Sequence, residues 1–385
     1  MIRQIKRLLK YGLIPYYYIV NPVKFNLLIN EYERTHEATK LYSYPLSFGV
    51  NISNICNQNC LCCNHDNAIM RDRNWLSSET IKEMSWLRFV KDIQLFAGNG
   101  DPLTNPNFPE IARMTRKIAP HSQIGTFTNG LALNGDNLDA VLESLDTIHI
   151  SLNAACEETY DKIILGGDFK RSMKNLRELS ERRPPNLKVE LSMILMKSSQ
   201  NDIIPMIDLI HKLDFQRLII CHLIIVTLDD QQFGEEESLK TDLDEETWAK
   251  YKKYAEERGI EFSFPTTIKP PENCYAPWLS AFITNDLVGD RIFVLCCSGI
   301  ETNLYVSPKA YSDFKSAWNH PRIQQIRATV NDKPLPGNNI CYLCKQLDRT
   351  DPEWHHKIRK LAEPLNGVFF APNDLPKSFP KEMVK

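Results

Sequence analysis

The residues best suited to do chemistry are three cysteines close together in the first part of the chain. Cys56, Cys60 and Cys63 form a C-x3-C-x2-C pattern. Three thiolates on so short a segment can wrap one face of a cubane iron–sulfur cluster, which leaves one iron without a protein ligand. A catalytic thiol or a buried structural cysteine explains one such residue, but not three at this spacing. The pattern therefore favours a metal centre with one open position.

Zinc is the alternative occupant of this cysteine group. A structural zinc site needs a fourth protein ligand, for which His65 is a candidate. His65 lies only two residues after Cys63, whereas zinc motifs usually draw their second pair of ligands from further along the chain. The spacing therefore favours an iron–sulfur cluster over zinc.

A second group of cysteines lies in the last third of the chain and comprises Cys274, Cys296, Cys297, Cys341 and Cys344. Cys296 and Cys297 follow a strand-like segment. Successive residues of a strand point to opposite faces, so we expect only one of these two thiols to reach a given metal centre. The spacing of the group is what a second iron–sulfur cluster needs. A zinc ribbon built on two cysteine pairs explains the same spacing and stays open as an alternative.

Short apolar or β-branched runs alternate with helical patterns from residue 46 onward, which is the signature of repeated β-α units and a parallel sheet. Six such runs fall short of the eight strands of a closed barrel. We therefore predict an α/β fold, a partial (β/α)6 barrel of the TIM type. The candidate strands are Leu46–Ile52, Ile93–Ala97, Gln123–Thr128, Thr147–Leu152, Leu187–Leu195 and Arg217–Ile225.

Polar residues follow the first four of these strands. The cysteine loop comes after the first strand, Gly98–Pro102 after the second and Asn129 after the third, while Ser151 and Asn153 lie at the end of the fourth. In parallel α/β sheets the ligand site lies at the carboxyl ends of the strands. We therefore expect these four strand ends to face one pocket.

A C-x3-C-x2-C loop after the first strand resembles the hallmark of the radical S-adenosylmethionine (SAM) superfamily. The resemblance implies that Cys56, Cys60 and Cys63 hold a [4Fe–4S] cluster. It also implies that the open iron of this cluster binds the amino and carboxylate groups of SAM. The cofactors expected at this site are therefore the cluster and SAM itself.

Three further segments are similar to the SAM-binding motifs of the superfamily. Asn99-Gly100-Asp101-Pro102 is similar to its Gly-Gly-Glu-Pro stretch, which holds the methionine amino group. Asn129 and Ser151 resemble its polar contacts to the methionine carboxylate and the ribose, and Asn153 is assigned to the same cofactor site. Alone, an Asn-Gly pair is usually a turn and a Ser or Asn at a strand end is usually a cap. Because these segments follow successive strands in the expected order, together they support a SAM site.

Two positions depart from the superfamily pattern. Cys62 stands where the family usually has an aromatic residue that helps to line the adenine site, so its backbone could serve there but its side chain could not stack. Asp101 replaces the commoner Glu, which shortens the carboxylate by one methylene. Neither departure removes a cluster ligand.

The second cysteine group resembles the SPASM and twitch extensions of the superfamily, in which a short hairpin and a following helix enclose an auxiliary cluster. Only four ligand positions are readily filled here, which favours the twitch-like form with one cluster over the full SPASM form with two. This resemblance, with the strand alternation, selects Cys274, Cys296, Cys341 and Cys344 as ligands of one auxiliary [4Fe–4S] cluster.

The resemblance implies an enzyme that reductively cleaves SAM to a 5′-deoxyadenosyl radical, which takes a hydrogen from an unactivated substrate carbon. We expect a flavodoxin- or ferredoxin-like electron donor. Twitch-type relatives include dehydrogenases of sugar-like and aminocyclitol alcohols. The leading hypothesis is thus a radical SAM oxidoreductase that oxidises an alcohol carbon of a small molecule or glycan precursor. No catalytic base is assigned: His222 and Asp229 are candidates, but a histidine in an apolar run is more often a core residue.

Two other functions stay open. Radical modification of a peptide side chain, by crosslinking, epimerisation or oxidation, uses the same chemistry. Only about 45 residues precede the first strand, a length that disfavours a separate peptide-recognition domain. The second alternative is a protein without catalysis whose cysteines bind zinc or an iron–sulfur cluster.

Composition indicates which partners and which cellular compartment to expect. The 385 residues include 46 basic and 48 acidic side chains, for a net charge of −2, whereas a general nucleic-acid-binding protein needs a basic stripe. Eleven cysteines, several in tight clusters, indicate metal ligation in a reducing, cytoplasmic compartment rather than disulfides. Cys156 and Cys221 have no partner nearby, and we interpret them as buried small apolar residues.

The predicted domains are a helical segment of residues 1–45, the barrel of residues 46–243, an auxiliary cluster domain of residues 244–358 and a tail of residues 359–385. The basic start of the first segment precedes an apolar run that Pro15 and Pro22 interrupt, and no cleavage site follows. We therefore expect neither a signal peptide nor a transmembrane span. A helix packed against the barrel is favoured over a peripheral membrane contact by residues 1–28.

Overall fold

The structure is a computed structural model, and it describes residues 20–63, 75–97, 100–223, 236–237, 243–264, 273–286, 289–293, 303–304 and 312–331. Several predictions fall outside these residues. They concern His65, Asn99, Asp229, Cys296, Cys297, Cys341, Cys344 and the tail of residues 359–385, together with the side chain of His222.

A ten-stranded sheet forms the centre of the described structure, in the order β12-β11-β10-β1-β3-β4-β5-β7-β8-β9. The strands from β10 to β9 in this order are parallel neighbours, and β11 and β12 continue the sheet in antiparallel pairing. The strands are β1 Ser47–Asn51, β3 Asp92–Phe96, β4 Gln123–Thr128, β5 Thr147–Ser151, β7 Lys188–Leu195, β8 Arg217–His222, β9 Glu261–Ser263, β10 Ser280–Asp286, β11 Gly289–Phe293 and β12 Asn303–Leu304. A separate two-stranded sheet pairs β2 Asn59–Cys60 with β6 Ile164–Leu165.

All six predicted strands are confirmed, as β1, β3, β4, β5, β7 and β8. Five of them begin and end within about one residue of the expected bounds. The sixth, β8, ends at His222, and Ile225 lies outside the described residues. The predicted parallel α/β sheet of a partial barrel is therefore correct.

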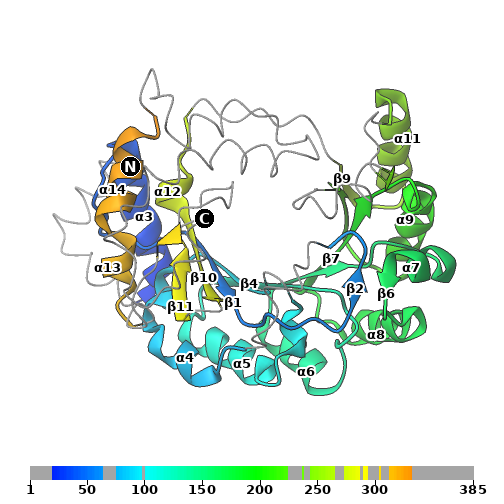
Figure 1. Ribbon diagram of the computed structural model, residues 1–385, viewed down its shortest axis with the longest axis horizontal. Coiled ribbons are helices and arrows are strands. Elements are labelled where there is room, and N and C mark those ends of the chain that lie inside the picture. Colours follow the sequence, from blue (N-terminus) through cyan, green and yellow to red (C-terminus); the bar gives the residue numbers. More distant parts are fainter. Residues whose placement is uncertain are drawn as a thin grey trace, which may run out of the picture.

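Helices cover the outer, convex side of the curved sheet, and the other face of the strands lines its inside (Figure 1). Several helices begin at a side-chain cap: Asp168 accepts the amide of Arg171 at the start of α8, and Asp244 accepts that of Thr247 at the start of α11. The helices are α3 Pro22–Thr35, α4 Ser78–Glu83, α5 Phe108–Ile118, α6 Gly135–Ser144, α7 Glu157–Ile163, α8 Phe169–Arg182, α9 Ile203–Lys212, α11 Glu245–Glu256, α12 Ala276–Leu279, α13 Phe314–Trp318 and α14 Pro321–Thr329. Short 3-10 turns are η2 Ser85–Phe89, η3 Pro102–Thr104 and η4 Gln200–Asp202.

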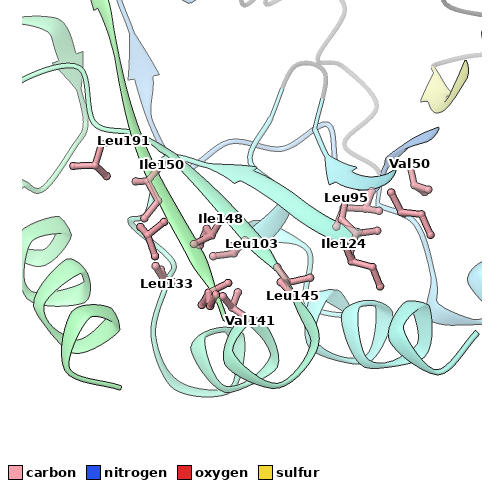
Figure 2. Close-up of a cluster of buried hydrophobic side chains, with 14 of the residues drawn as sticks. Val50, Leu95, Leu103, Ile124, Leu133, Val141, Leu145, Ile148, Ile150 and Leu191 are labelled. Carbon is pink, nitrogen blue, oxygen red and sulfur yellow. The ribbon is translucent and has the colours of Figure 1, made fainter. Parts of the chain in front are cut away.

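The core lies between the sheet and these helices. Alternate residues of each strand point into it, as Ile148 and Ile150 of β5 do near Val141 of α6 and Leu145, the residue that follows this helix (Figure 2). Burial of each such side chain stabilises the fold by about 1.5–3 kcal/mol. Because side chains of a strand alternate between faces, His149 and Ser151 of β5 lie on the concave face. The core thereby determines which residues line the inside of the barrel.

The sheet extends past the six predicted strands at both edges. Strand β9, in a region assigned from sequence to the auxiliary domain, pairs in parallel with β8. At the other edge, β10 pairs in parallel with β1. The predicted boundary at residues 243 and 244 therefore falls between elements of one continuous sheet, and the division into functional domains stays a prediction.

The described part of the N-terminal segment is a helix that packs on the C-terminal elements. Asn30 of α3 donates to the carbonyl of Trp278 at 2.7 Å, and Arg327 of α14 donates to the carbonyls of Thr39 and Pro277 at 2.9 Å each. Residues far apart in sequence thus hold each other beside β1. Among the described residues, no helix has both the length and the apolar character needed to span a membrane.

Candidate cofactor site

The cysteine loop leaves the carboxyl end of β1 and is held at its far end by the β2–β6 pair. Cys60 lies in β2 opposite Ile164, and the amide of Leu61 donates to the carbonyl of Ile163 at 2.9 Å. Gln58 adds a side-chain anchor, because its Nε2 donates to the hydroxyl of the buried Tyr160 at 2.8 Å. The loop is therefore fixed to the sheet at one end and to the α7–β6 segment at the other.

The environment of the loop disfavours bare thiolates. Burial raises the pKa of Cys56 above its ordinary value. Burial also raises the pKa of Cys60, and the neighbouring charges of Cys62, Cys63 and Cys56 raise it further. Desolvated thiolates that repel one another are stabilised by a bound cation, so the chemistry of this donor set fits an iron–sulfur cluster.

Cys62 differs from its neighbours, because its side chain is buried in the hydrophobic core. Burial, followed by the charge of Cys63, raises the pKa of Cys62 to about 12. In the described part of the chain, no group of three or more His, Cys, Asp or Glu side chains is arranged to hold a metal ion. Ligation by Cys56, Cys60 and Cys63 therefore stays a prediction that rests on their chemistry and spacing.

The segment after β3 lies directly against the cysteine loop. A Cβ added to Gly100 would stand 2.6 Å from the carbonyl oxygen of Ile55, which is closer than two such atoms can approach. The next residue, Asp101, donates its amide to the same carbonyl at 2.7 Å. The hydroxyl of Thr104 donates to it as well, at 2.8 Å. The residue before the first predicted ligand is thus held by hydrogen bonds from two residues of one segment, and Gly100 of that segment leaves room for the close approach.

The carboxylate of Asp101 is buried and fully engaged by the protein. It accepts the amide of Leu103 at 2.9 Å, the hydroxyl of Thr128 at 2.8 Å and the amide of Asn129 at 2.6 Å. Burial raises the pKa of Asp101, and these donors oppose the rise. Pro102 is also buried and begins η3. Asp101 therefore joins the segment after β3 to the end of β4.

Asn129 connects the end of β4 to the cysteine loop. Its Nδ2 donates to Oδ1 of Asn57 at 2.7 Å and lies 3.7 Å from Sγ of Cys56, while its Oδ1 accepts the amide of Leu131 at 2.9 Å. An amide donor beside a cluster-ligating sulfur stabilises the thiolate form. The structure therefore brings three of the four predicted strand ends together around Cys56.

Ser151 and Asn153 lie at the end of β5. Ser151 is half-buried on the concave face, and its Oγ lies 3.4 Å from Oγ of Ser192. Asn153 adopts a left-handed backbone with φ of 63°, which asparagine tolerates better than most residues. Its Oδ1 accepts the amide of Ile194 at 3.0 Å. Asn153 therefore holds β7 beside β5, and its contact with a cofactor stays a prediction.

Of the predicted auxiliary ligands, only Cys274 lies among the described residues. It is half-buried, and its amide donates to Oδ1 of Asn331 at 2.8 Å. The interpretation of Cys156 as buried is wrong: the residue is exposed because it precedes α7, and its Sγ lies 3.1 Å from Oγ1 of Thr159. Cys221 is half-buried on β8.

Sequence reasoning missed several residues that support the site. Thr128 binds Asp101 and directly precedes Asn129, so its place at a strand end was a usable signal. Tyr160 gave no such signal, because its contact with Gln58 joins residues 102 positions apart. His149 and Glu190 are polar residues between buried ones in β5 and β7, a pattern that marks an inward-facing polar row.

The family comparison agrees with this arrangement. Residues 50–240, which span the cysteine loop and the strands from β1 to β8, match the model of the radical SAM superfamily. The chain belongs to the radical SAM superfamily. As a radical SAM protein, it binds a [4Fe–4S] cluster and SAM.

Curated relatives of this radical SAM chain are named GTP 3′,8-cyclases. The protein of Chlorobaculum tepidum is 27% identical over 155 residues, which are 40% of this chain and 46% of the relative. A probable GTP 3′,8-cyclase of Saccharolobus islandicus is 24% identical over 192 residues, 50% of this chain and 61% of the relative. The chain thus spans about half the length of these relatives.

Solved structures share the fold of this radical SAM chain at low sequence identity. SuiB of Streptococcus suis bound to SAM matches with a TM-score of 0.58 and 16% identity, over 78% of this chain and 71% of SuiB. The anSMEcpe structure with bound SAM matches with a TM-score of 0.55 and 14% identity, over 87% of this chain and 97% of that one. At these identities the likeness establishes the fold alone.

Proposed function

We propose that this radical SAM enzyme cleaves SAM reductively to a 5′-deoxyadenosyl radical, which takes a hydrogen atom from a substrate carbon. The observation that carries the proposal is the contact of Asn129 and Gly100 with the loop that bears Cys56. Three elements with SAM-site motifs therefore meet at the carboxyl edge of one parallel sheet, where ligands of such sheets bind.

The residues of the chain have separate tasks in this proposal. Cys56, Cys60 and Cys63 would hold the cluster, and the cluster would supply the electron for SAM cleavage. The side-chain amide of Asn129 donates toward Sγ of Cys56, and the carboxylate of Asp101 keeps Asn129 in place by accepting its backbone amide. Gly100 and Ser151 present backbone and hydroxyl groups to SAM at the same strand ends, as do Asn99, Pro102 and the backbone of Cys62 by resemblance.

An auxiliary [4Fe–4S] cluster held by Cys274, Cys296, Cys341 and Cys344 is part of the proposal. Its support is the cysteine spacing and its resemblance to a twitch-like extension. When bound there, such a cluster would supply an acceptor for the electron left on a substrate radical, and the net reaction would then be an oxidation. A flavodoxin- or ferredoxin-like protein is the proposed source of the first electron.

The substrate class is open between two proposals. Oxidation of an alcohol carbon has no support from the comparisons, since the curated relatives are named cyclases. Modification of a peptide has one point in its favour, because SuiB, which shares the fold, is also seen bound to a precursor peptide. Incubation of the reduced enzyme with polyols and with peptides separates the two, with loss of two hydrogens from one class read by mass spectrometry.

The proposed function is tested by metal content and SAM cleavage. Anaerobically reconstituted protein should hold about eight irons, as two cubane clusters require, and should release 5′-deoxyadenosine on reduction. The triple variant Cys56→Ala, Cys60→Ala, Cys63→Ala should lose about half the iron and all cleavage. Cys156→Ala is the matched control, because this exposed cysteine lies outside both predicted clusters. Zinc without cleavage, or cleavage retained by the triple variant, would contradict the proposal.

A further inference from the structure

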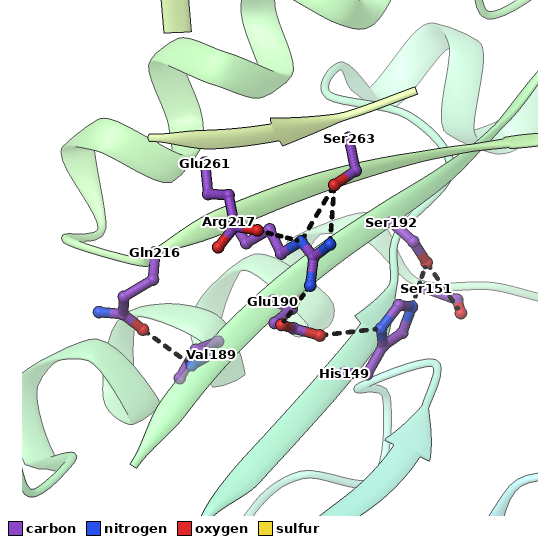
Figure 3. A network of polar contacts seen from close by, with 9 residues as sticks. All are labelled: His149, Ser151, Val189, Glu190, Ser192, Gln216, Arg217, Glu261 and Ser263. Carbon is purple, nitrogen blue, oxygen red and sulfur yellow. Dashed lines mark hydrogen bonds and ion pairs between the residues drawn. The ribbon is translucent and has the colours of Figure 1, made fainter. Parts of the chain in front are cut away.

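Behind Ser151, a row of polar side chains crosses the concave face of the sheet. His149 of β5 is paired in register with Glu190 of β7, Glu190 with Arg217 of β8, and Arg217 with Glu261 of β9. Figure 3 shows these side chains side by side, with Ser192 and Ser151 one step nearer the carboxyl ends of their strands. The row therefore leads from the interior of the barrel toward the proposed SAM site.

The contacts in the row form one continuous chain. Nδ1 of His149 lies 3.6 Å from Oε2 of Glu190, and Nε2 lies 2.7 Å from Oγ of Ser192. Ser192 donates in turn to Oγ of Ser151 at 3.4 Å. Each nitrogen of the imidazole thus has a partner, with a carboxylate on one side and a hydroxyl chain on the other.

Glu190 is held in its charged form. The contact with His149 lowers its pKa most, and Arg217, which lies 3.3 Å away, lowers it further. An ionised carboxylate only accepts hydrogen bonds, so its place beside Nδ1 favours a proton on that nitrogen of His149. Nε2 then faces the hydroxyl of Ser192.

The protonation of Nε2 determines which way the two hydroxyls point. When Nε2 carries a proton it donates to Ser192, which donates to Ser151 and leaves the Ser151 hydrogen free to donate toward the strand end. When Nε2 is bare, it accepts from Ser192, and Ser192 can then accept the Ser151 hydrogen. The Ser151 hydroxyl therefore acts as a donor at the strand end in the first case and as an acceptor in the second.

The surroundings keep water from replacing these partners. The side chains of His149 and Glu190 are only 12% and 20% exposed. The ring of Phe127 on β4 lies 4.9 Å from the His149 ring and covers it from the other side. The charged groups that face His149 from neighbouring described strands are Glu190 and, beyond it, Arg217 and Glu261.

We propose that His149 and Glu190 are positioning residues that hold Ser192 and, through it, orient the Ser151 hydroxyl toward SAM. The inference rests on the proposed function, because it assigns Ser151 to the SAM site. The carboxylate and ribose of SAM carry oxygens that form hydrogen bonds with a hydroxyl, so a Ser151 hydroxyl held in one orientation favours binding.

The test is SAM affinity, measured by equilibrium dialysis on anaerobically reconstituted protein without reductant. His149→Gln should raise the Kd for SAM about three- to tenfold, because Ser192 loses its ring partner. Glu190→Gln should raise it by a smaller factor, since it releases only the far side of the ring.

Two more variants separate positioning from a structural role. Ser192→Ala removes only a hydroxyl and should raise the Kd for SAM by a similar factor with no change in iron content. In that background, His149→Gln should have no further effect on SAM affinity. Glu261→Gln is the matched control: it removes a carboxylate from the same row at 68% exposure, on the far side of Arg217. Its Kd for SAM should match that of the unaltered protein.

Each outcome bears on the inference. An unchanged Kd for SAM in both His149→Gln and Ser192→Ala overturns it and leaves the proposed function standing. Equal losses in Glu261→Gln and Glu190→Gln also overturn it, since the row would then act only by holding the sheet. Absence of SAM binding in unaltered protein with full iron content overturns the proposed function together with this inference.

Discussion

Gly100 lies directly against the backbone of Ile55, the residue before the first predicted cluster ligand. A Cβ on Gly100 would stand 2.6 Å from the carbonyl oxygen of Ile55 and 2.7 Å from its amide nitrogen. Both neighbours are backbone atoms, so neither can move without moving the cysteine loop. The close approach of two segments, rather than an unusual φ, is what requires glycine here.

Gly100→Ala should therefore displace the cysteine loop. We expect a loss of about 1–3 kcal/mol in the free energy of unfolding, as for other overpacked sites, together with lower iron content and SAM cleavage. Gly259→Ala is the control, because Gly259 has a φ of 72° with nothing within 4 Å. The strain of an alanine at this φ should lower the free energy of unfolding by about 1–2 kcal/mol without loss of iron. Equal iron content in both variants would show that Gly100 does not position the loop.

Asp101→Asn should weaken the link between the segment after β3 and the end of β4. The asparagine NH2 group would face donors from Leu103, Thr128 or Asn129, so at least one buried hydrogen bond is lost. The expected cost is about 1–3 kcal/mol in denaturant unfolding, with weaker SAM binding because Asn129 shifts. Thr128→Ser keeps the hydroxyl and should be close to the unaltered protein. A stable Asp101→Asn variant with normal SAM affinity would refute this role.

Tyr160→Phe should loosen the far end of the cysteine loop. The change removes the acceptor of Gln58 Nε2 and leaves that buried amide without its 2.8 Å partner. We expect destabilisation of about 1–3 kcal/mol and faster loss of iron to a chelator. Tyr254→Phe is the control, since its hydroxyl donates to Asp208 at an exposed site, and such changes usually stay within about 0.5 kcal/mol. The same rate of iron loss in both variants would count against the anchor.

Lys315 should make stability rise with pH in the alkaline range. Burial lowers its pKa from the ordinary 10.5 to about 8. Between these values the unfolded chain binds more protons at this residue than the folded chain, so the free energy of unfolding increases as the pH rises from about 8 to 10.5. Lys315→Met should remove that contribution, whereas Lys253→Met, at an exposed lysine, should keep it. Denaturant unfolding across this pH range measures the difference, and an unchanged slope in Lys315→Met would exclude the effect.

Much of the fold could be predicted because its signals are local. The runs that became β1, β3, β4, β5, β7 and β8 are apolar or β-branched and are separated by helical patterns, so their order alone implies a parallel sheet. Asn129 and Ser151 could be found for the same reason, since they end such runs. The edges β9 and β10 escaped prediction, because a short strand is defined by its partner rather than by its own residues.

The sequence by itself determined the kind of chemistry in this protein: the spacing of Cys56, Cys60 and Cys63 and the order of the motifs behind them point to one superfamily. Only the tertiary structure decided how those motifs support one another. Asp101 proved to be committed to Thr128 and Asn129, and His149 to a row that ends at Ser151. The physical reason is that spacing along a chain selects which groups can react, whereas hydrogen bonds between distant strands depend on sheet register and burial, which arise only when the chain folds.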